Sequence, residues 1–207
     1  MLLCDIGNTS YHFFDTITKI DYKESTKKFN PSKMVEKIYF ICVHPMVKES
    51  LKNLVNWVDI SSYINMEQYY KTMGIDRIVA LEAITDGLII DAGSAITVDV
   101  KTDGRFIGGF IYPGVTAMNN TYKNISKALE YPFNFNINLQ NLPRDSQSAV
   151  SYGYLKLLYN EVISYNKNII LTGGDSDLFL KIFKDATIDK FLIFKGMQKI
   201  ILETKSD

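Results

Sequence analysis

Cysteine and histidine are scarce in this 207-residue chain, which contains only two of each. Cys4 and Cys42 lie in apolar, strand-like runs, so we expect reduced core residues rather than a disulfide or a metal site. His12 and His44 have no cysteine, histidine or carboxylate companions at metal-ligand spacing, and we interpret both as structural. No serine–histidine–aspartate arrangement stands out either.

The chain also lacks an excess of charge of either sign, because 23 basic and 23 acidic residues give a formal net charge of zero. Such a protein is not drawn as a whole to nucleic acid or to an anionic membrane. No apolar run reaches the ~18 residues that would span a bilayer. The N-terminus enters an apolar strand without the basic segment of a signal peptide, so we expect a cytoplasmic protein.

Two common nucleotide-binding motifs are missing as well. The sequence contains neither Gly-x-x-x-x-Gly-Lys-Ser/Thr nor Gly-x-Gly-x-x-Gly, so a P-loop or a Rossmann site has no support. The content of 46% hydrophobic and 22% charged residues is ordinary for a globular protein, and the length allows a sizeable core.

Two Asp-x-Gly turns, each after an apolar strand, are the most informative feature that is present. The first is Asp5-Ile6-Gly7-Asn8-Thr9, and the second is Asp91-Ala92-Gly93-Ser94. Glycine lets backbone N–H groups approach an anion, and a carboxylate at a strand end can hold a cation. Each turn alone is also an ordinary hairpin turn. The pair predicts phosphoryl transfer, with both turns facing a nucleotide and its metal in a cleft.

The order of the predicted elements repeats around these turns. In the first half, three strands precede a helix, a strand, a helix and a strand, and the second half also begins with three strands. Near the C-terminus we predict a strand over 190–194 and a helix over 196–202. The repetition predicts two similar lobes, residues 1–85 and 86–207, that join within a helix over about 76–86.

A third segment, Gly74-Ile75-Asp76-Arg77, precedes a helical run. By base rates, the first interpretation of Asp76 is a helix N-cap. An Asp beside an Arg on a loop also suits a general base next to an anion-binding group. The carboxylate would then accept a hydroxyl proton while Arg77 binds a substrate carboxylate through two hydrogen bonds.

Glycine-rich segments follow two further strands. Gly108-Gly109-Phe110-Ile111-Tyr112-Pro113-Gly114 indicates backbone close to a ligand or a helix N-terminus aimed at it, with a β-bulge and a Pro-Gly turn as the alternative. Thr172-Gly173-Gly174-Asp175 is a turn of the nucleotide-binding type, weakly specific alone. Asp99 lies in mid-strand, and its role stays open between ligand binding and a cross-strand contact.

In this order along the chain, the motifs are similar to those of type III pantothenate kinases, and the duplicated lobes resemble the acetate and sugar kinase, Hsp70 and actin superfamily. The resemblance spans nearly the whole chain. It implies an α/β fold of two ribonuclease H-like (actin-like ATPase) lobes, each a mixed five-stranded sheet with flanking helices. It also implies ATP-dependent phosphorylation of pantothenate to 4'-phosphopantothenate, the first step of coenzyme A biosynthesis, by a homodimer.

The resemblance implies which residues contact ATP and its cations. The ATP contacts would be Ser94 and the eight residues Asp5, Ile6, Gly7, Asn8, Thr9, Ser10, Tyr11 and His12. Asp91 would hold the monovalent cation, K⁺ or NH₄⁺, and Asp5 would approach Mg²⁺ directly or through water. The family usually has threonine where this chain has Ser94, but the hydroxyl is kept.

The resemblance likewise implies the pantothenate site. Asp76 would be the catalytic proton acceptor, and Gly74, Ile75, Asp76 and Arg77 would bind pantothenate. Ser146 takes the place of a threonine in the family's Asn-Thr-x-x-Ala-x-x-x-Gly pattern and would reach across a dimer interface. A substrate-contacting tyrosine precedes Gly-x-Asp-Arg in the family, but the spacing of Tyr69 and Tyr70 is shorter, so neither is assigned.

Two other functions stay open. One is another enzyme of the superfamily, a sugar kinase or a phosphatase, against which the Gly-x-Asp-Arg motif speaks. The other is a non-catalytic relative that acts as a regulator. The presence of Asp5, Asp76 and Asp91 favours an enzyme.

Overall fold

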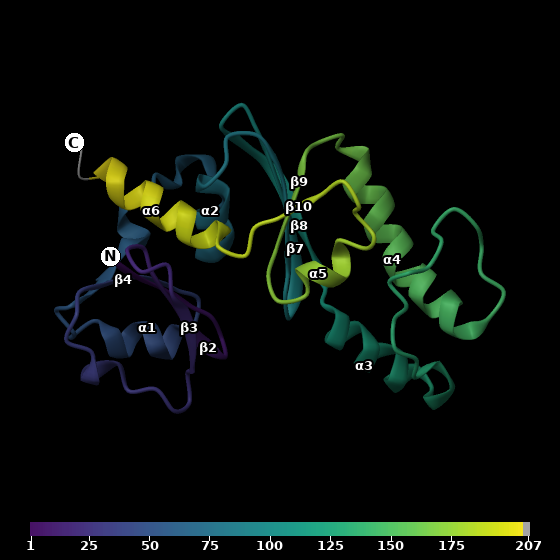
Figure 1. Cartoon of the computed structure of the whole chain (residues 1–207), viewed down its shortest axis with the longest axis horizontal. Coiled ribbons are helices and arrows are strands. Elements are labelled where there is room, and N and C mark those ends of the chain that lie inside the picture. The colour runs from purple at the N-terminus through teal and green to yellow at the C-terminus, as the bar shows by residue number, and fades with distance from the viewer. Residues whose placement is uncertain (205–207) are drawn as a thin grey trace. The chain divides into compact units, whose positions relative to one another are not determined.

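Each Asp-x-Gly turn follows the central strand of a five-stranded sheet. The computed structural model describes residues 1–204, which form two units (Figure 1). Unit 1 comprises Met1–Ile84 together with the segment that begins at Phe191, and unit 2 comprises Thr85–Lys190. The predicted lobes, 1–85 and 86–207, differ from these units in the C-terminal segment. Residues 205–207 of the predicted second lobe lie outside the described residues.

The sheet of unit 1 has the strand order β3-β2-β1-β4-β5. Its central strand β1 (Leu2–Ile6) pairs antiparallel with β2 (Ser10–Asp15) and parallel with β4 (Ile38–Cys42). The edge strands are β3 (Asp21–Ser25), antiparallel to β2, and β5 (Trp57–Asp59), parallel to β4. The sheet is therefore mixed, with a hairpin on one side of β1 and parallel strands on the other.

The sheet of unit 2 repeats this arrangement strand for strand. Its central strand β6 (Gly87–Ala92) pairs antiparallel with β7 (Ala95–Thr102) and parallel with β9 (Ile169–Thr172). The edge strands are β8 (Arg105–Pro113), antiparallel to β7, and β10 (Thr187–Ile188), parallel to β9. The predicted pair of mixed five-stranded sheets with flanking helices is confirmed.

Six α-helices accompany the sheets in the part of the chain that the structure describes. They are α1 (Pro45–Leu51), α2 (Ile75–Glu82) and α6 (Leu192–Thr204) in unit 1, and α3 (Val115–Ile125), α4 (Ser146–Ser164) and α5 (Ser176–Phe179) in unit 2. None of the described helices is both long and apolar enough to cross a membrane.

The predicted strand over 190–194 is wrong, because α6 begins at Leu192. A short apolar run fits a buried strand and the buried stripe of a helix equally well. In the structure, Leu192 and Phe194 are buried together with Met197 and Ile200, one to two helical turns further on. α6 packs against α2 and β1, which is the physical reason that this segment belongs to unit 1.

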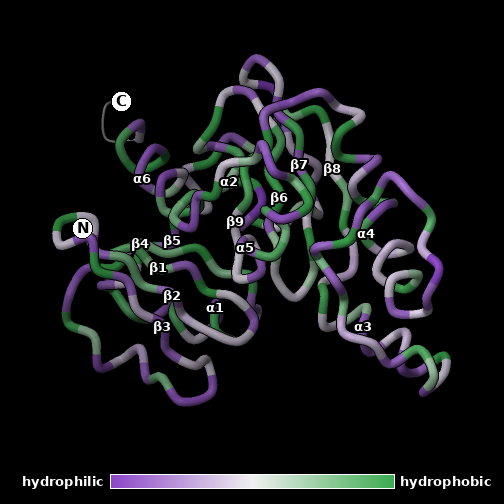
Figure 2. The backbone as a smooth tube through the Cα atoms, turned by 45° about the vertical axis from the view of Figure 1, so that its right-hand side comes forward, coloured by the Kyte–Doolittle hydropathy of each residue, from purple (hydrophilic) through white to green (hydrophobic). Residues whose placement is uncertain are grey.

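Apolar clusters cover both faces of the unit 1 sheet, and Figure 2 shows the central strands coloured largely as hydrophobic. Because side chains alternate along a strand, Leu3 of β1 joins the cluster beneath α6, whereas Cys4 and Ile6 join the opposite cluster. Both cysteines of the chain are buried and free, as core residues. The second cluster also contains Phe13 and Trp57, whose ring centroids are 6.2 Å apart.

Replacement of Phe13 by alanine tests this cluster. The Phe13 side chain is fully buried, so Phe13→Ala should lower the free energy of unfolding by about 3 to 5 kcal/mol through lost contacts and a cavity. Trp57 is the only tryptophan, so its fluorescence during urea unfolding reports on unit 1 directly. Val55→Ala, at a fully exposed position, is the control and should change stability by less than ~0.5 kcal/mol. Equal changes in stability for the two variants would contradict the placement of Phe13 in the buried cluster.

Candidate active site

The turn after β1 presents two backbone amides that donate to no group among the described residues. The Gly7 amide donates to the Ser10 carbonyl over 3.0 Å, which closes the turn. Asn8 and Thr9 are exposed, and within residues 1–204 their amides donate no hydrogen bond. Asp5, the penultimate residue of β1, lies just before them. Amides beside a carboxylate suit a phosphate group and its cation.

Three of the eight residues predicted to contact ATP have side chains that serve the fold of unit 1. Ile6 and Tyr11 are buried in the core. The imidazole of His12 donates to Asp21 from Nε2 over 2.9 Å and lies edge-on to Phe194, with ring centroids 4.9 Å apart. Burial lowers the pKa of His12 below its ordinary value of 6.5, against the opposing effect of Asp21. A neutral ring at pH 7 brings no positive charge to the turn.

The turn after β6 repeats this design in unit 2. Asp91 is again the penultimate residue of the central strand, opposite Thr97 of β7 and Thr172 of β9. The Gly93 amide donates to the Ala95 carbonyl over 3.1 Å. Ser94 is exposed, and neither its amide nor its hydroxyl donates a hydrogen bond within the described part of the chain. The hydroxyl is therefore available to donate a hydrogen bond to an anion, and its contact with ATP stays a prediction.

Two glycines from later in the chain pack directly on this second turn. A Cβ on Gly114 would lie 2.3 Å from the Ser94 carbonyl oxygen, and a Cβ on Gly173 would lie 2.4 Å from Asp91 Oδ1. The Asp175 amide also donates to the Ala92 carbonyl over 2.9 Å. Both glycine-rich segments that the sequence singled out thus meet at Asp91 and Ser94. Their high glycine content was the sequence signal for this close backbone approach.

The β-bulge alternative is also correct for the start of the first glycine-rich segment. The register between β7 and β8 shifts between Val100 and Lys101, opposite Gly108. Asp99 lies in the middle of β7, opposite Gly109, and is 2% exposed. The close approach to the Asp91 turn therefore comes from Gly114 at the end of the segment, and not from its first glycines.

Asp76 occupies the first turn of α2 without being its N-cap. Gly74 is the N-cap residue and makes no side-chain capping bond, whereas Asp76 is the second helical residue. Its Oδ1 atom accepts a hydrogen bond from the Arg77 amide over 2.9 Å. A Cβ on Gly74 would lie 2.4 Å from that oxygen, so glycine at this position leaves room for the carboxylate.

Arg77 is buried, and its guanidinium is held by a tyrosine. The Nη1 atom donates to the Tyr70 hydroxyl over 2.6 Å. Tyr69 is buried, and its hydroxyl donates to Glu82 at the end of α2. Of the two tyrosines that the sequence left unassigned, Tyr70 contacts the Gly-x-Asp-Arg motif through its hydroxyl.

Ser146 is exposed at the first position of α4. The preceding Asp145 caps this helix by accepting a hydrogen bond from the Ser148 amide over 2.9 Å. That bond lowers the pKa of the Asp145 carboxyl. The cap fixes where α4 begins and hence where the Ser146 hydroxyl lies.

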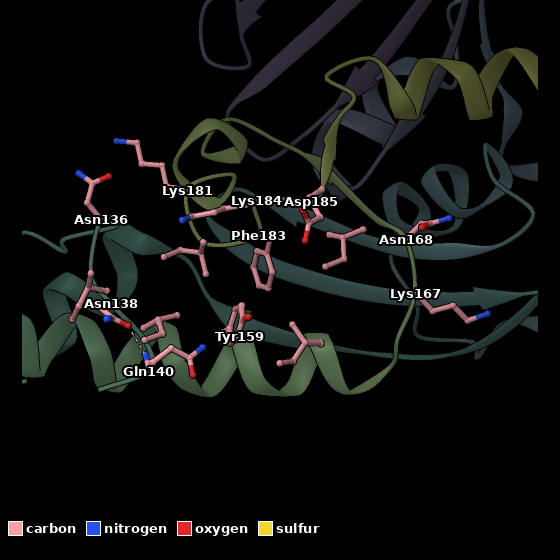
Figure 3. A pocket seen from close by; sticks show the side chains of 16 residues that line it. Asn136, Asn138, Gln140, Tyr159, Lys167, Asn168, Lys181, Phe183, Lys184 and Asp185 are labelled. Atoms are coloured by element: carbon pink, nitrogen blue, oxygen red, sulfur yellow. Dashed lines mark hydrogen bonds between the residues drawn. The ribbon is translucent and has the colours of Figure 1, made fainter. Parts of the chain in front are cut away.

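A pocket of about 630 Å³ in unit 2 contains none of these residues (Figure 3). Tyr159 and Phe183 face each other at its centre, and Lys181 and Lys184 lie along it. The pocket includes Ile169 at the amino end of β9, whereas Asp91 lies beside Thr172 at the carboxyl end of that strand. It is therefore distinct from the site around Asp91. Among residues 1–204, no group of three or more His, Cys, Asp and Glu side chains gathers as a metal site.

Comparisons with known proteins add the family. A family model described as type III pantothenate kinase matches residues 1–166. A type III pantothenate kinase from Sulfurimonas denitrificans is 57% identical over 201 residues, which cover 97% of both chains. A Campylobacter jejuni crystal structure, named for a Baf family transcriptional activator, is 37% identical and covers 100% of both chains with a TM-score of 0.88.

A more distant structure supports the fold alone. A Sinorhizobium meliloti protein named for a 2-dehydro-3-deoxygalactonokinase is 9% identical, covers 98% of both chains and has a TM-score of 0.58. Together with the equal strand order of the two sheets, this likeness confirms the predicted duplicated fold of the actin-like ATPases and sugar kinases.

The contact of Gly173 with the Asp91 turn is testable by stability. Gly173 has a φ of 85°, and an added Cβ would also meet the Ala92 carbonyl oxygen at 2.5 Å. We expect Gly173→Ala to lower the free energy of unfolding by ~2 kcal/mol or more, through backbone strain and displacement of the turn. The matched control is Gly174→Ala, where an added Cβ has nothing within 4 Å. Circular dichroism during urea unfolding measures both, and a Gly173→Ala protein as stable as Gly174→Ala refutes the packing argument.

Proposed function

Because this chain belongs to the type III pantothenate kinase family, we propose that it phosphorylates pantothenate to 4'-phosphopantothenate with ATP, the first step of coenzyme A biosynthesis. The observation that carries the proposal is the start of α2, where a carboxylate and a guanidinium stand on successive residues. Asp76 is half-buried in the first helical turn, and Arg77 is oriented by Tyr70.

In the proposed reaction, Asp76 accepts the proton of the pantothenate hydroxyl while the hydroxyl oxygen attacks the γ-phosphorus of ATP. The new O–P bond forms as the bond from γ-phosphorus to the bridging oxygen breaks, and ADP leaves with that electron pair. The proton then passes from Asp76 to water. Arg77 binds the substrate carboxylate, with Gly74 and Ile75 beside it, and the exposed Ser146 supplies a further hydroxyl contact.

We assign ATP to the Asp5–His12 segment and to Ser94. The unoccupied amides of Asn8 and Thr9 support this assignment, because phosphate oxygens accept such donors. Asp5 would hold Mg²⁺, directly or through water, and Asp91 would hold K⁺ or NH₄⁺. Mg²⁺ is usually bound by one or two carboxylates plus substrate phosphates, which these positions allow. When bound, the cations neutralise charge on the phosphate oxygens.

The function is tested by release of ADP in a coupled assay with pantothenate, ATP and Mg²⁺, with K⁺ present or replaced by Na⁺. We expect turnover that depends on pantothenate and increases with K⁺. A panel of sugars and other hydroxyl acceptors is the control, since preference for a sugar would identify another kinase of the superfamily. Equal rates in K⁺ and Na⁺ would contradict the proposal that Asp91 holds K⁺.

A regulator that binds nucleic acid is the second candidate, because the Campylobacter jejuni structure carries the name of a transcriptional activator. Such proteins draw much of their affinity from contacts of lysine and arginine with phosphates. The present chain has equal numbers of basic and acidic residues and keeps Asp5, Asp76 and Asp91. These observations favour the kinase, and an inactive protein that binds DNA would favour the regulator.

The proposal includes a cytoplasmic homodimer. A reducing, ATP-containing compartment agrees with the two free thiols, and fractionation of cells tests the location. For the dimer, the edge strand β8 presents Ile107 and Ile111, 62% and 65% exposed, on one face. Long apolar edge strands are normally covered in native proteins. We propose that a second copy of this chain covers β8 in the homodimer.

Sedimentation velocity tests the dimer. The protein should sediment at twice the chain mass, and the double variant Ile107→Asp, Ile111→Asp should shift it to the monomer, because buried carboxylates oppose association. Ile17→Asp, at an exposed position of unit 1, is the control. A monomeric wild-type protein would refute the dimer, and a double variant that stays dimeric would assign the interface elsewhere.

Asp76→Asn tests the proton acceptor. Asparagine keeps the shape of the side chain but cannot accept the proton, so kcat should fall about 10² to 10⁴-fold. ATP binding, measured by calorimetry, should change little. Asp103→Asn is the matched control, because Asp103 is exposed in the β7–β8 turn at a φ of 49° that asparagine tolerates. Unchanged turnover in Asp76→Asn would exclude the assigned role.

A further inference from the structure

We infer that α6 sets the position of the pantothenate site by clamping α2, with Gly196 as the positioning residue and Lys199 as its support. This inference rests on the proposed function of Asp76 and Arg77. Nothing in the motifs points to α6, and the matched region of the family model, residues 1–166, ends before it. Figures 1 and 2 both show α6 beside α2.

The contact at Gly196 leaves no room for any other residue. A Cβ on Gly196 would lie 1.8 Å from the Val79 carbonyl oxygen and 2.8 Å from the Val79 carbonyl carbon. These are backbone atoms in the middle of α2, so they cannot turn aside as the end of a side chain can. An ordinary contact needs at least 3.4 Å, so the two helices would have to move apart by roughly 1.6 Å.

Lys199 of α6 binds the C-terminal end of α2. Its Nζ atom donates to the Glu82 carbonyl over 3.0 Å, and Glu82 is the last residue of α2. The Glu82 side chain in turn accepts the hydrogen bond from Tyr69, whose neighbour Tyr70 holds Arg77. α6 is therefore connected to the tyrosine segment that orients the guanidinium.

The interface between these contacts is apolar and buried. Val79 of α2 shares a cluster with Phe194, Met197, Ile200 and Ile201 of α6. α2 is only eight residues long, so a displacement at Val79 is transmitted over less than one turn to Arg77 and Asp76. Displacement of a positioning element by about 1 Å can cost ~10²-fold in rate, because the reacting groups no longer align.

The test is the kinetic constants of Gly196→Ala. We expect kcat/KM for pantothenate to fall ~10 to 100-fold, while KM for ATP changes by less than about 2-fold and the circular dichroism spectrum is retained. A variant that only weakened the fold would instead lose active protein without changing KM. Leu202→Ala, at a position of α6 that is 58% exposed, is the control and should behave like the wild type.

Lys199→Met is the second variant, because it removes the bond to Glu82 without pushing the helices apart. It should lower kcat/KM for pantothenate by a smaller factor, with KM for ATP unchanged. If Gly196→Ala does not fold, the kinetics of Lys199→Met test the inference alone. Wild-type kinetics in Lys199→Met and Gly196→Ala, or equal losses toward pantothenate and ATP, would overturn the inference. A wild-type protein without pantothenate kinase activity would refute the proposed function instead.

Discussion

The way in which each central strand pairs with its two neighbours in its own sheet is the constraint on which the rest of the structure depends. β1 and β6 each have an antiparallel hairpin partner on one side and a parallel partner on the other. The hairpin creates the turn after the carboxylate, and the parallel neighbour ends at the same edge of the sheet. In unit 2 that neighbour brings Thr172 beside Asp91, and in unit 1 the Val43 amide donates to Ile6 over 3.0 Å.

Close backbone contacts around the second turn follow from this pairing. Gly114 and Gly173 approach the turn more closely than any residue with a Cβ could. Hydrogen bonds then hold the approaching segments in place, as from Asp175 to Ala92. The exposed Ser94 is thus mounted on a turn that is supported from two sides, which suits a group that must meet a phosphate without rearrangement.

The start of α2 is ordered differently. No strand end fixes it, and Asp76 and Arg77 depend on a short helix, on Tyr70 and on the packing of α6. A helix of eight residues has little stability of its own, so its place is decided by tertiary contacts. Under the proposed assignment of Asp76 and Arg77 to the pantothenate site, binding of the acceptor substrate relies on the last helix of the described chain.

Much of the candidate site could be predicted from the sequence, because its signals are local. An apolar run that ends in Asp-x-Gly predicts a strand and a turn wherever the chain places it, and both turns are present. Gly-x-Asp-Arg predicted a carboxylate at the beginning of a helix, although Gly74, not Asp76, is the N-cap. The error at 190–194 has the same root, since a four-residue apolar run carries no period that separates strand from helix.

The sequence by itself determined the repeated order of elements along the chain, the two Asp-x-Gly turns and the residue types of the Gly-x-Asp-Arg segment, because each depends on neighbours within a few positions. Only the tertiary structure decided that Tyr70 contacts Arg77, which glycines pack on the Asp91 turn and that α6 belongs to unit 1. Those are contacts between segments up to more than 180 residues apart. Their partners are selected by packing in three dimensions, which no local pattern records.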